Sequence, residues 1–200
     1  IDKNISFKEE ITMNLVLEPI KKRRSVRSFR PDQITDDELN SIIESGLWAP
    51  SGHNTQPWHF LVVQDKSKID QMSRSTIEKM ANSPIDWVRK LAAKEGYHLF
   101  HGAPTVIIVS GRQSGDTFLP VVADCAAAIQ NMLLGAESLN IGTCWIGLTS
   151  FLFEDSEETA SLKIPEGYAP YYSIAVGYKS AGFIPAPPTR KEGTVSTFGK

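Results

Sequence analysis

A cluster of basic side chains near the start of the chain has the composition of an anion-binding site. Within it, the run Arg-Arg-Ser-Val-Arg at 23–27 offers guanidinium forks and a hydroxyl group, which match the several oxygens of a phosphate. The two lysines of the cluster are expected to stay in water, and the alternative interpretation of the whole cluster is a solvated surface patch. Its six cations fall within ten residues: Lys21, Lys22, Arg23, Arg24, Arg27 and Arg30.

A loop rich in polar side chains follows this cluster after one expected helix. Thr35 and Glu38 form a capping-box pattern, apolar residues then recur at helical spacing, and Pro50 interrupts them, so the sequence predicts a helix from Thr35 to about Trp48. The loop at the end of this helix reads Ala-Pro-Ser-Gly-His-Asn-Thr-Gln-Pro-Trp over 49–58. Together, its amide and hydroxyl groups and the basic cluster predict a site for an anion that carries a polar ring.

The overall charge argues against a nucleic-acid partner. The chain has 21 basic and 23 acidic residues and a net charge of −2 at pH 7, so it lacks a general electrostatic footprint for a polyanion. At 200 residues it fits one domain that buries roughly 70% of the surface exposed by its unfolded chain.

Cysteine content and the absence of long apolar runs predict a cytoplasmic protein. Cys125 and Cys144 are the two cysteines and both lie in apolar stretches, which favours a reducing compartment over a disulfide framework. Residues 1–12 do not resemble a signal peptide, and no apolar run is long enough to span a membrane. Met13 leaves open whether residues 1–12 are native.

Helical and strand patterns alternate along the rest of the chain. Apolar and β-branched runs predict strands at 58–63, 104–110, 142–148 and 171–178. The first of these reads as a buried strand, and the second has no polar face, which places it in the middle of a sheet. Helical spacing predicts helices over about 67–81, 120–139 and 155–162.

Two features of this pattern bear on function. The stretch 66–100 ends in an irregular helical pattern, which makes it the best candidate for a mobile cover over a pocket. The helix at 120–139 is apolar in nearly every direction, so we expect it to be buried on all sides, and in a chain of this size a partner subunit would have to cover part of it. The proline-rich segment after Gly182 should lie extended over something else.

Four segments in this order resemble the FMN-dependent nitroreductases: Arg-Arg-Ser-Val-Arg-Ser-Phe at 23–29, the loop at 49–58, Gly-Thr-Cys-Trp-Ile-Gly at 142–147, and Pro-Thr-Arg-Lys at 188–191. The resemblance implies an α+β fold with three layers, α-β-α, around a central, mostly antiparallel sheet. It also implies a homodimer that holds FMN at the subunit interface. In this interpretation residues 1–18 are an N-terminal extension or arm, and residues 19–200 form a single FMN-binding domain.

The resemblance also implies which residues bind the cofactor. The first segment would hold the phosphate and ribityl chain, the loop would reach across from the other subunit, and the third segment would lie beside the hydride-accepting nitrogen of the ring. A basic residue near the end of the chain would close on the phosphate. The implied residues are Arg23, Arg24, Ser25 and Arg27, then Pro50, Ser51, Asn54 and Gln56, then Ile146, Gly147 and Leu148, and finally Arg190.

The activity expected from this resemblance is transfer of reducing equivalents from NAD(P)H through FMN to a small acceptor such as a nitroaromatic or a quinone. Alternatives are a specialised branch of the family, which dehalogenates iodinated tyrosines or fragments the flavin, and a carrier or sensor that binds FMN without turnover. We expect no catalytic side chain and no metal, because Cys144 reads as a buried inert thiol and His98 and His101 lack a third ligand.

Overall fold

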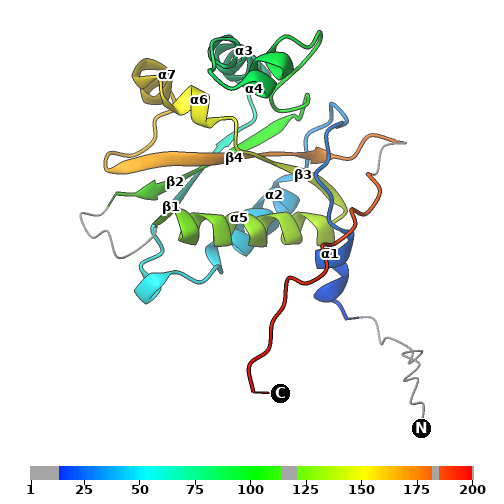
Figure 1. Ribbon diagram of the computed structural model, residues 1–200. Coiled ribbons are helices and arrows are strands. Elements are labelled where there is room, and N and C mark those ends of the chain that lie inside the picture. The colour runs from blue at the N-terminus through cyan, green and yellow to red at the C-terminus, as the bar shows by residue number, and fades with distance from the viewer. Residues whose placement is uncertain (1–13, 114–120, 182–184, 200) are drawn as a thin grey trace.

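A four-stranded sheet forms the centre of the computed structural model, which describes residues 14–113, 121–181 and 185–199 (Figure 1). The strands are β1 (Trp58–Val63), β2 (Thr105–Arg112), β3 (Ile141–Ile146) and β4 (Tyr168–Tyr178). Their order across the sheet is β1-β2-β4-β3, and every neighbouring pair is antiparallel. The α+β class and the antiparallel sheet are therefore confirmed, whereas residues 1–13 of the extension expected at 1–18 lie outside the described residues.

Helices cover both faces of the sheet, as Figure 1 shows. On one face lie α2 (Asp36–Leu47) and α5 (Val121–Ser138), and on the other lie α3 (Lys66–Ala81), α4 (Asp86–Ala92), α6 (Ser150–Phe153) and α7 (Ser156–Ser161). A short helix, α1 (Leu17–Lys22), precedes the basic cluster, and a single 3-10 turn, η1 (Gly52–Asn54), lies in the polar loop. In the described segments, no helix combines the length and apolar character that crossing a bilayer requires.

The predicted start of α2 is confirmed in detail. The Thr35 hydroxyl accepts a hydrogen bond from the Glu38 N–H, and the Thr35 N–H donates to the Glu38 carboxylate at 2.8 Å, which completes the capping box. The Tyr178 hydroxyl donates to the same carboxylate at 2.7 Å. Because Tyr178 ends β4, this bond ties the start of α2 to the sheet and sets where the following polar loop begins.

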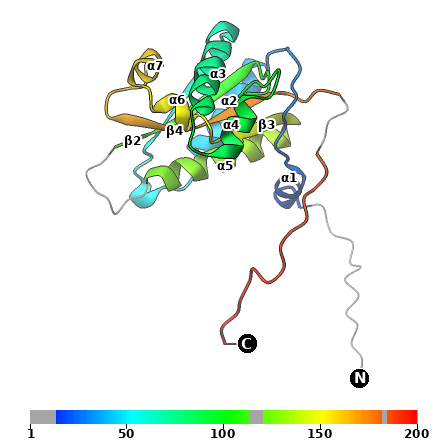
Figure 2. The same ribbon diagram turned by 45° about the horizontal axis from the view of Figure 1, so that its top comes forward.

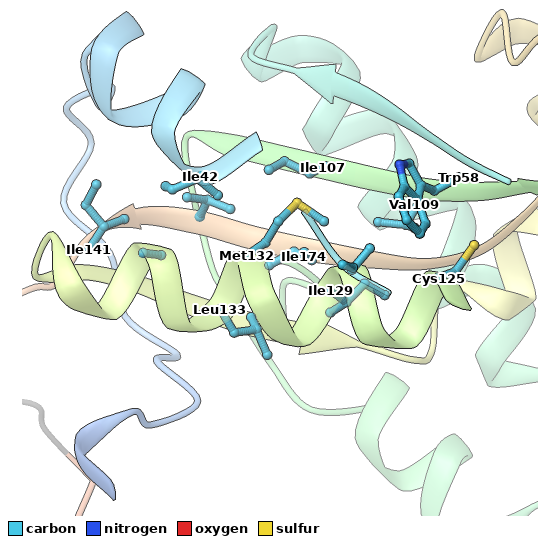
Figure 3. Packing of buried hydrophobic residues seen from close by; sticks show 14 of the residues in the cluster. Ile42, Trp58, Ile107, Val109, Cys125, Ile129, Met132, Leu133, Ile141 and Ile174 are labelled. Carbon is cyan, nitrogen blue, oxygen red and sulfur yellow. The ribbon is translucent and has the colours of Figure 1, made fainter. Parts of the chain in front are cut away.

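One part of the apolar core lies between the sheet and the helices α2 and α5 (Figure 3). It brings Ile42 of α2 against side chains of β2, β3, β4 and α5, all of them inaccessible or nearly so to solvent. The labelled members from the strands and α5 are Trp58, Ile107, Val109, Cys125, Ile129, Met132, Leu133, Ile141 and Ile174. A second core on the opposite face packs α3, α4 and α6 onto the sheet.

The strand predictions hold in position but differ in detail. The β2 strand is central and buried along nearly its whole length, as its unbroken apolar run indicated. The prediction that 58–63 is buried is wrong for its middle four residues, which are partly exposed, because β1 is an edge strand. The third predicted strand ends at Ile146, two residues early, and the fourth begins at Tyr168, three residues early.

One helix prediction needs correction, and another concerns a surface that a single chain leaves open. The acidic helix expected over 155–162 is the shorter α7, and a separate turn of helix, α6, precedes it. Asp155 separates them because its carboxylate caps α7 through the N–H groups of Glu157 and Glu158. Burial of α5 is incomplete within one chain, since Val122 is 40% exposed and other apolar side chains on its outer face are only partly covered. The expected burial on all sides would therefore need a partner subunit.

Candidate active site

A cavity of about 440 Å³ lies between the end of β3 and the segment that follows α4. Its lining combines apolar and aromatic side chains with two cations, which is the composition of a pocket for a planar, negatively charged ligand. The lining residues are Arg27, Leu91, Lys94, Tyr97, Leu99, His101, Cys144, Trp145, Ile146, Gly147 and Leu148. Two of the predicted segments, the basic run at 23–27 and the third segment at 142–147, therefore meet in one place.

The basic run reaches this cavity because it lies along the edge of β3. Ser25 forms a parallel bridge with Thr143, and the Val26 N–H donates to the Thr143 carbonyl at 2.9 Å. Val26 is buried at 2% exposure. Side chains alternate along an extended segment, so the buried Val26 leaves Arg27 exposed on the other side, where it lines the cavity.

The other members of the basic run take different positions. The Arg24 guanidinium donates from Nη1 to the carbonyls of Lys21, Lys22 and Arg23 at 2.7, 3.0 and 2.8 Å, so it caps the end of α1. Arg24 lines a second cavity of about 280 Å³, beside Lys179 and away from the first. Arg23 is half-buried and lies near the thiol of Cys144, where its charge partly opposes the rise in the thiol pKa that burial causes.

The polar loop lies elsewhere in the same chain. The Gly52 N–H donates to the Asp124 carboxylate at 3.2 Å, which holds the loop at the start of α5 and on the opposite face of the sheet from α4 (Figure 1). Within it, Ser51 Oγ accepts from the Gln56 N–H at 3.0 Å, and Gln56 Nε2 donates to Asn54 Oδ1 at 3.1 Å. None of the four predicted loop residues, Pro50, Ser51, Asn54 and Gln56, lines the cavity of its own chain.

The loop backbone is unusual in having left-handed residues that are not glycine. His53, Asn54 and Gln56 have φ angles of 50°, 56° and 45°. Such conformations carry strain and occur preferentially at functional sites. Arg190 lies in the exposed tail 185–199, which leaves the body beside α1 in both Figure 1 and Figure 2, and it does not line the cavity of its own chain either.

The backbone at the end of β3 is open toward a ligand. Gly147 has an ordinary φ, and a Cβ added there would meet no atom within 4 Å, so neither conformation nor packing within this chain requires glycine. Within the described segments, the N–H groups of Gly147 and Leu148 have no hydrogen-bond acceptor. A flat ligand that accepts hydrogen bonds can therefore approach this backbone closely.

The side of the cavity opposite β3 was missed by sequence reasoning at the level of residues. The segment 66–100 was singled out as a cover, but no motif marked Leu91, Lys94 or Tyr97 within it. The rings of Tyr97 and His101 meet edge to face, with 6.4 Å between their centres. Only the tertiary structure reveals this pair, because the segment 97–102 is a series of turns with no periodic pattern.

His98 holds this turn in place. Its Nδ1 accepts from the N–H groups of Phe100 and Gly102 at 3.2 and 3.3 Å, and its Nε2 lies 3.2 Å from the Asp70 carboxylate of α3. These contacts assign the ring proton to Nε2. Among the described residues, no group of three metal-binding side chains lies together.

Burial shifts the pKa of three groups that line the cavity. Burial raises the pKa of the Cys144 thiol despite the nearby arginines, and it also raises the pKa of Tyr97. For His101, burial first and then the positive charge of Arg27 lower the pKa to about 4. At neutral pH, Cys144 and Tyr97 are therefore protonated and His101 is neutral, so the charge of the cavity comes from Arg27 and Lys94.

We expect His101 to stay neutral down to about pH 5. Its pKa of about 4 lies below the ordinary value of 6.5, so between these values the unfolded chain binds more protons, and stability falls as the pH drops through this window. In NMR titrations the ring signals of His101 should not move above about pH 5. A midpoint near the ordinary histidine value would contradict this assignment, and His101→Gln should reduce the loss of stability in acid.

Comparison with known proteins agrees with this geometry. The nitroreductase family model matches residues 20–178. The chain belongs to the nitroreductase family. An Archaeoglobus fulgidus protein with the provisional name NADH dehydrogenase/NAD(P)H nitroreductase is 30% identical in sequence. The match covers 83% of this chain and 86% of the length of that protein. An FMN reductase (NADPH) of Bacillus subtilis is 28% identical, and the match covers 83% of this chain and 66% of the length of that protein.

A solved structure shares the fold of this family member over nearly its whole length. The nitroreductase of Bacteroides fragilis with bound FMN is 38% identical, with a TM-score of 0.83, and the match covers 92% of this chain and 99% of that one. The assignment to the nitroreductases, made from four short segments, is thus confirmed, and the relatives' names agree with the expected enzyme class.

Proposed function

We propose that this nitroreductase family member binds FMN in the 440 Å³ cavity and uses it to pass reducing equivalents from NAD(P)H to a small acceptor such as a nitroaromatic or a quinone. The observation that carries the proposal is the meeting of Arg27 with the open backbone of Gly147 and Leu148 in one cavity. The FMN-bound Bacteroides fragilis structure, similar over nearly the whole chain, supports the choice of cofactor.

The residues at the end of β3 suit the ring of FMN, which when bound would accept and release hydride. The free N–H groups of Gly147 and Leu148 would donate to acceptor atoms of the ring, and Ile146 would supply an apolar contact. The Arg27 guanidinium would stabilise negative charge on the reduced ring in a site that Leu91 and Leu99 keep poor in water. No side chain needs to act as a nucleophile.

The phosphate end would be held by the rest of the basic run. Arg23 and Ser25 lie next to Arg27 along the edge of β3, so they are the main candidates. Arg24 belongs to the same proposal, although its guanidinium would have to leave the three carbonyls that it now contacts. Charge-assisted hydrogen bonds to a phosphate are worth about 1.5–3 kcal/mol each when well formed.

We also propose that the protein is a homodimer whose second subunit completes each site. Apolar side chains remain exposed on the face that carries α2 and α5, with Leu47 at 51%, Trp48 at 80% and Val122 at 40%. A second copy packed there would cover the outer face of α5. The loop residues Pro50, Ser51, Asn54 and Gln56 and the tail residue Arg190 lie outside the cavity of their own chain, so the proposal assigns them to the site of the other subunit.

The test is reduction and reoxidation of the purified protein without oxygen. NADH or NADPH should bleach the yellow colour rapidly, and a nitroaromatic or a quinone should restore it, while free FMN at the same concentration serves as the control. A bound flavin that stays oxidised with every donor would contradict the enzyme and support a carrier or sensor. Destruction of the flavin on exposure to oxygen would instead support the flavin-fragmenting branch.

A further inference from the structure

The cavity contains more positive charge than the cofactor explains. Arg27 and Lys94 are permanent cations, the lining includes no carboxylate, and His101 is neutral at working pH. In the proposed function, Arg27 serves the flavin ring at the edge of β3. Lys94 comes from the opposite wall, two residues after the end of α4, so its charge is left for a second ligand.

Lys94 also differs from its neighbours because no ion-pair partner for it lies among the described residues. Lys90 on α4 pairs with Asp86 at 2.7 Å, and Arg89 pairs with Asp86 at 3.3 Å. No carboxylate in the described segments lies within ion-pair distance of Lys94, which is exposed at the cavity. An unpaired cation at a cavity keeps its full attraction for an anionic ligand.

The residues that line the cavity around Lys94 indicate the shape and polarity of that second ligand. Leu91 precedes it by three residues and Tyr97 follows it by three residues. Trp145 of β3 and Leu148, just after this strand, line the same cavity. These apolar and aromatic surfaces favour a flat ring. We propose that Lys94 selects aromatic acceptors with an anionic substituent, such as a carboxylate, and this inference rests on the proposed function.

Two acceptors of nearly the same shape, one anionic and one neutral, separate the effect of the ligand's charge from that of its shape. With the holoenzyme, the ratio of kcat/KM for 4-nitrobenzoate to that for the neutral 4-nitrobenzamide should fall about fivefold in Lys94→Gln, as expected for one partly exposed ion pair. The change should lie in the KM for 4-nitrobenzoate. Lys94→Arg should keep the ratio, and Lys90→Gln, which removes the same charge from the same segment outside the cavity, should leave it unchanged.

Binding provides a readout that does not depend on turnover. The Kd of 4-nitrobenzoate for the oxidised holoenzyme, followed by the change in the flavin spectrum, should weaken about fivefold in Lys94→Gln, with no change for 4-nitrobenzamide. An unchanged ratio and Kd, or an effect confined to the KM for NADH, would overturn the role of Lys94. Failure of both compounds to reoxidise the reduced parent protein would count against the proposed function, while the Kd comparison would still decide the role of Lys94.

Discussion

Gly147→Val is expected to yield a folded protein that has lost its flavin. A Cβ at this position meets no atom of the chain within 4 Å, so the apoprotein should keep the stability of the parent apoprotein. The added side chain would occupy the space through which the ring approaches the Gly147 and Leu148 backbone. We expect FMN affinity to fall by at least about 100-fold, or about 2.7 kcal/mol.

The measurement is the Kd of FMN for the apoprotein, from quenching of flavin fluorescence. Far-UV circular dichroism and thermal unfolding must be compared between apoproteins, because bound flavin itself stabilises the folded state. A variant that binds FMN as tightly as the parent would show that the ring does not lie against Gly147. It would also remove the main structural support for the cofactor site.

Gly111→Val should have the opposite result: the free energy of unfolding falls, and any loss of FMN affinity is secondary to that fall. Gly111 lies on β2 under α5, and a Cβ there would be 2.3 Å from Val121 Cγ1 and 2.9 Å from Tyr171 Cε2. Both neighbours would have to shift, which disturbs the packing between α5 and the sheet. Overpacking of this kind costs about 1–3 kcal/mol, occasionally more.

Urea unfolding of the two apoprotein variants provides the comparison, because the substitution is chemically the same at both positions. Gly111→Val should shift the midpoint to much lower urea, and Gly147→Val should not shift it. Equal loss of stability in both variants would mean that Gly147 is required for folding. Its openness would then not indicate a ligand.

Much of the fold follows from local patterns in the sequence. The capping box at Thr35 and Glu38, the unbroken apolar run of β2 and the helical spacing of α3 each act over a few residues, so each element was predictable without the tertiary structure. The edge position of β1 was not predictable in this way. Its exposure depends on which strands pair, and that is a property of the whole sheet.

For the candidate site too, some residues were predictable from the sequence and others only from the tertiary structure. The types and order of the residues alone marked the basic run and the stretch at 142–147 as candidate ligand-binding segments. The charge of a guanidinium group and the missing side chain of glycine are the same in every fold. Only the tertiary structure decided that Arg27 meets Gly147 while Arg24 turns away to cap α1. It also decided that Lys94, Tyr97 and His101 form the opposite wall. Contacts between segments this far apart depend on how the helices pack on the sheet, and no local pattern encodes that packing.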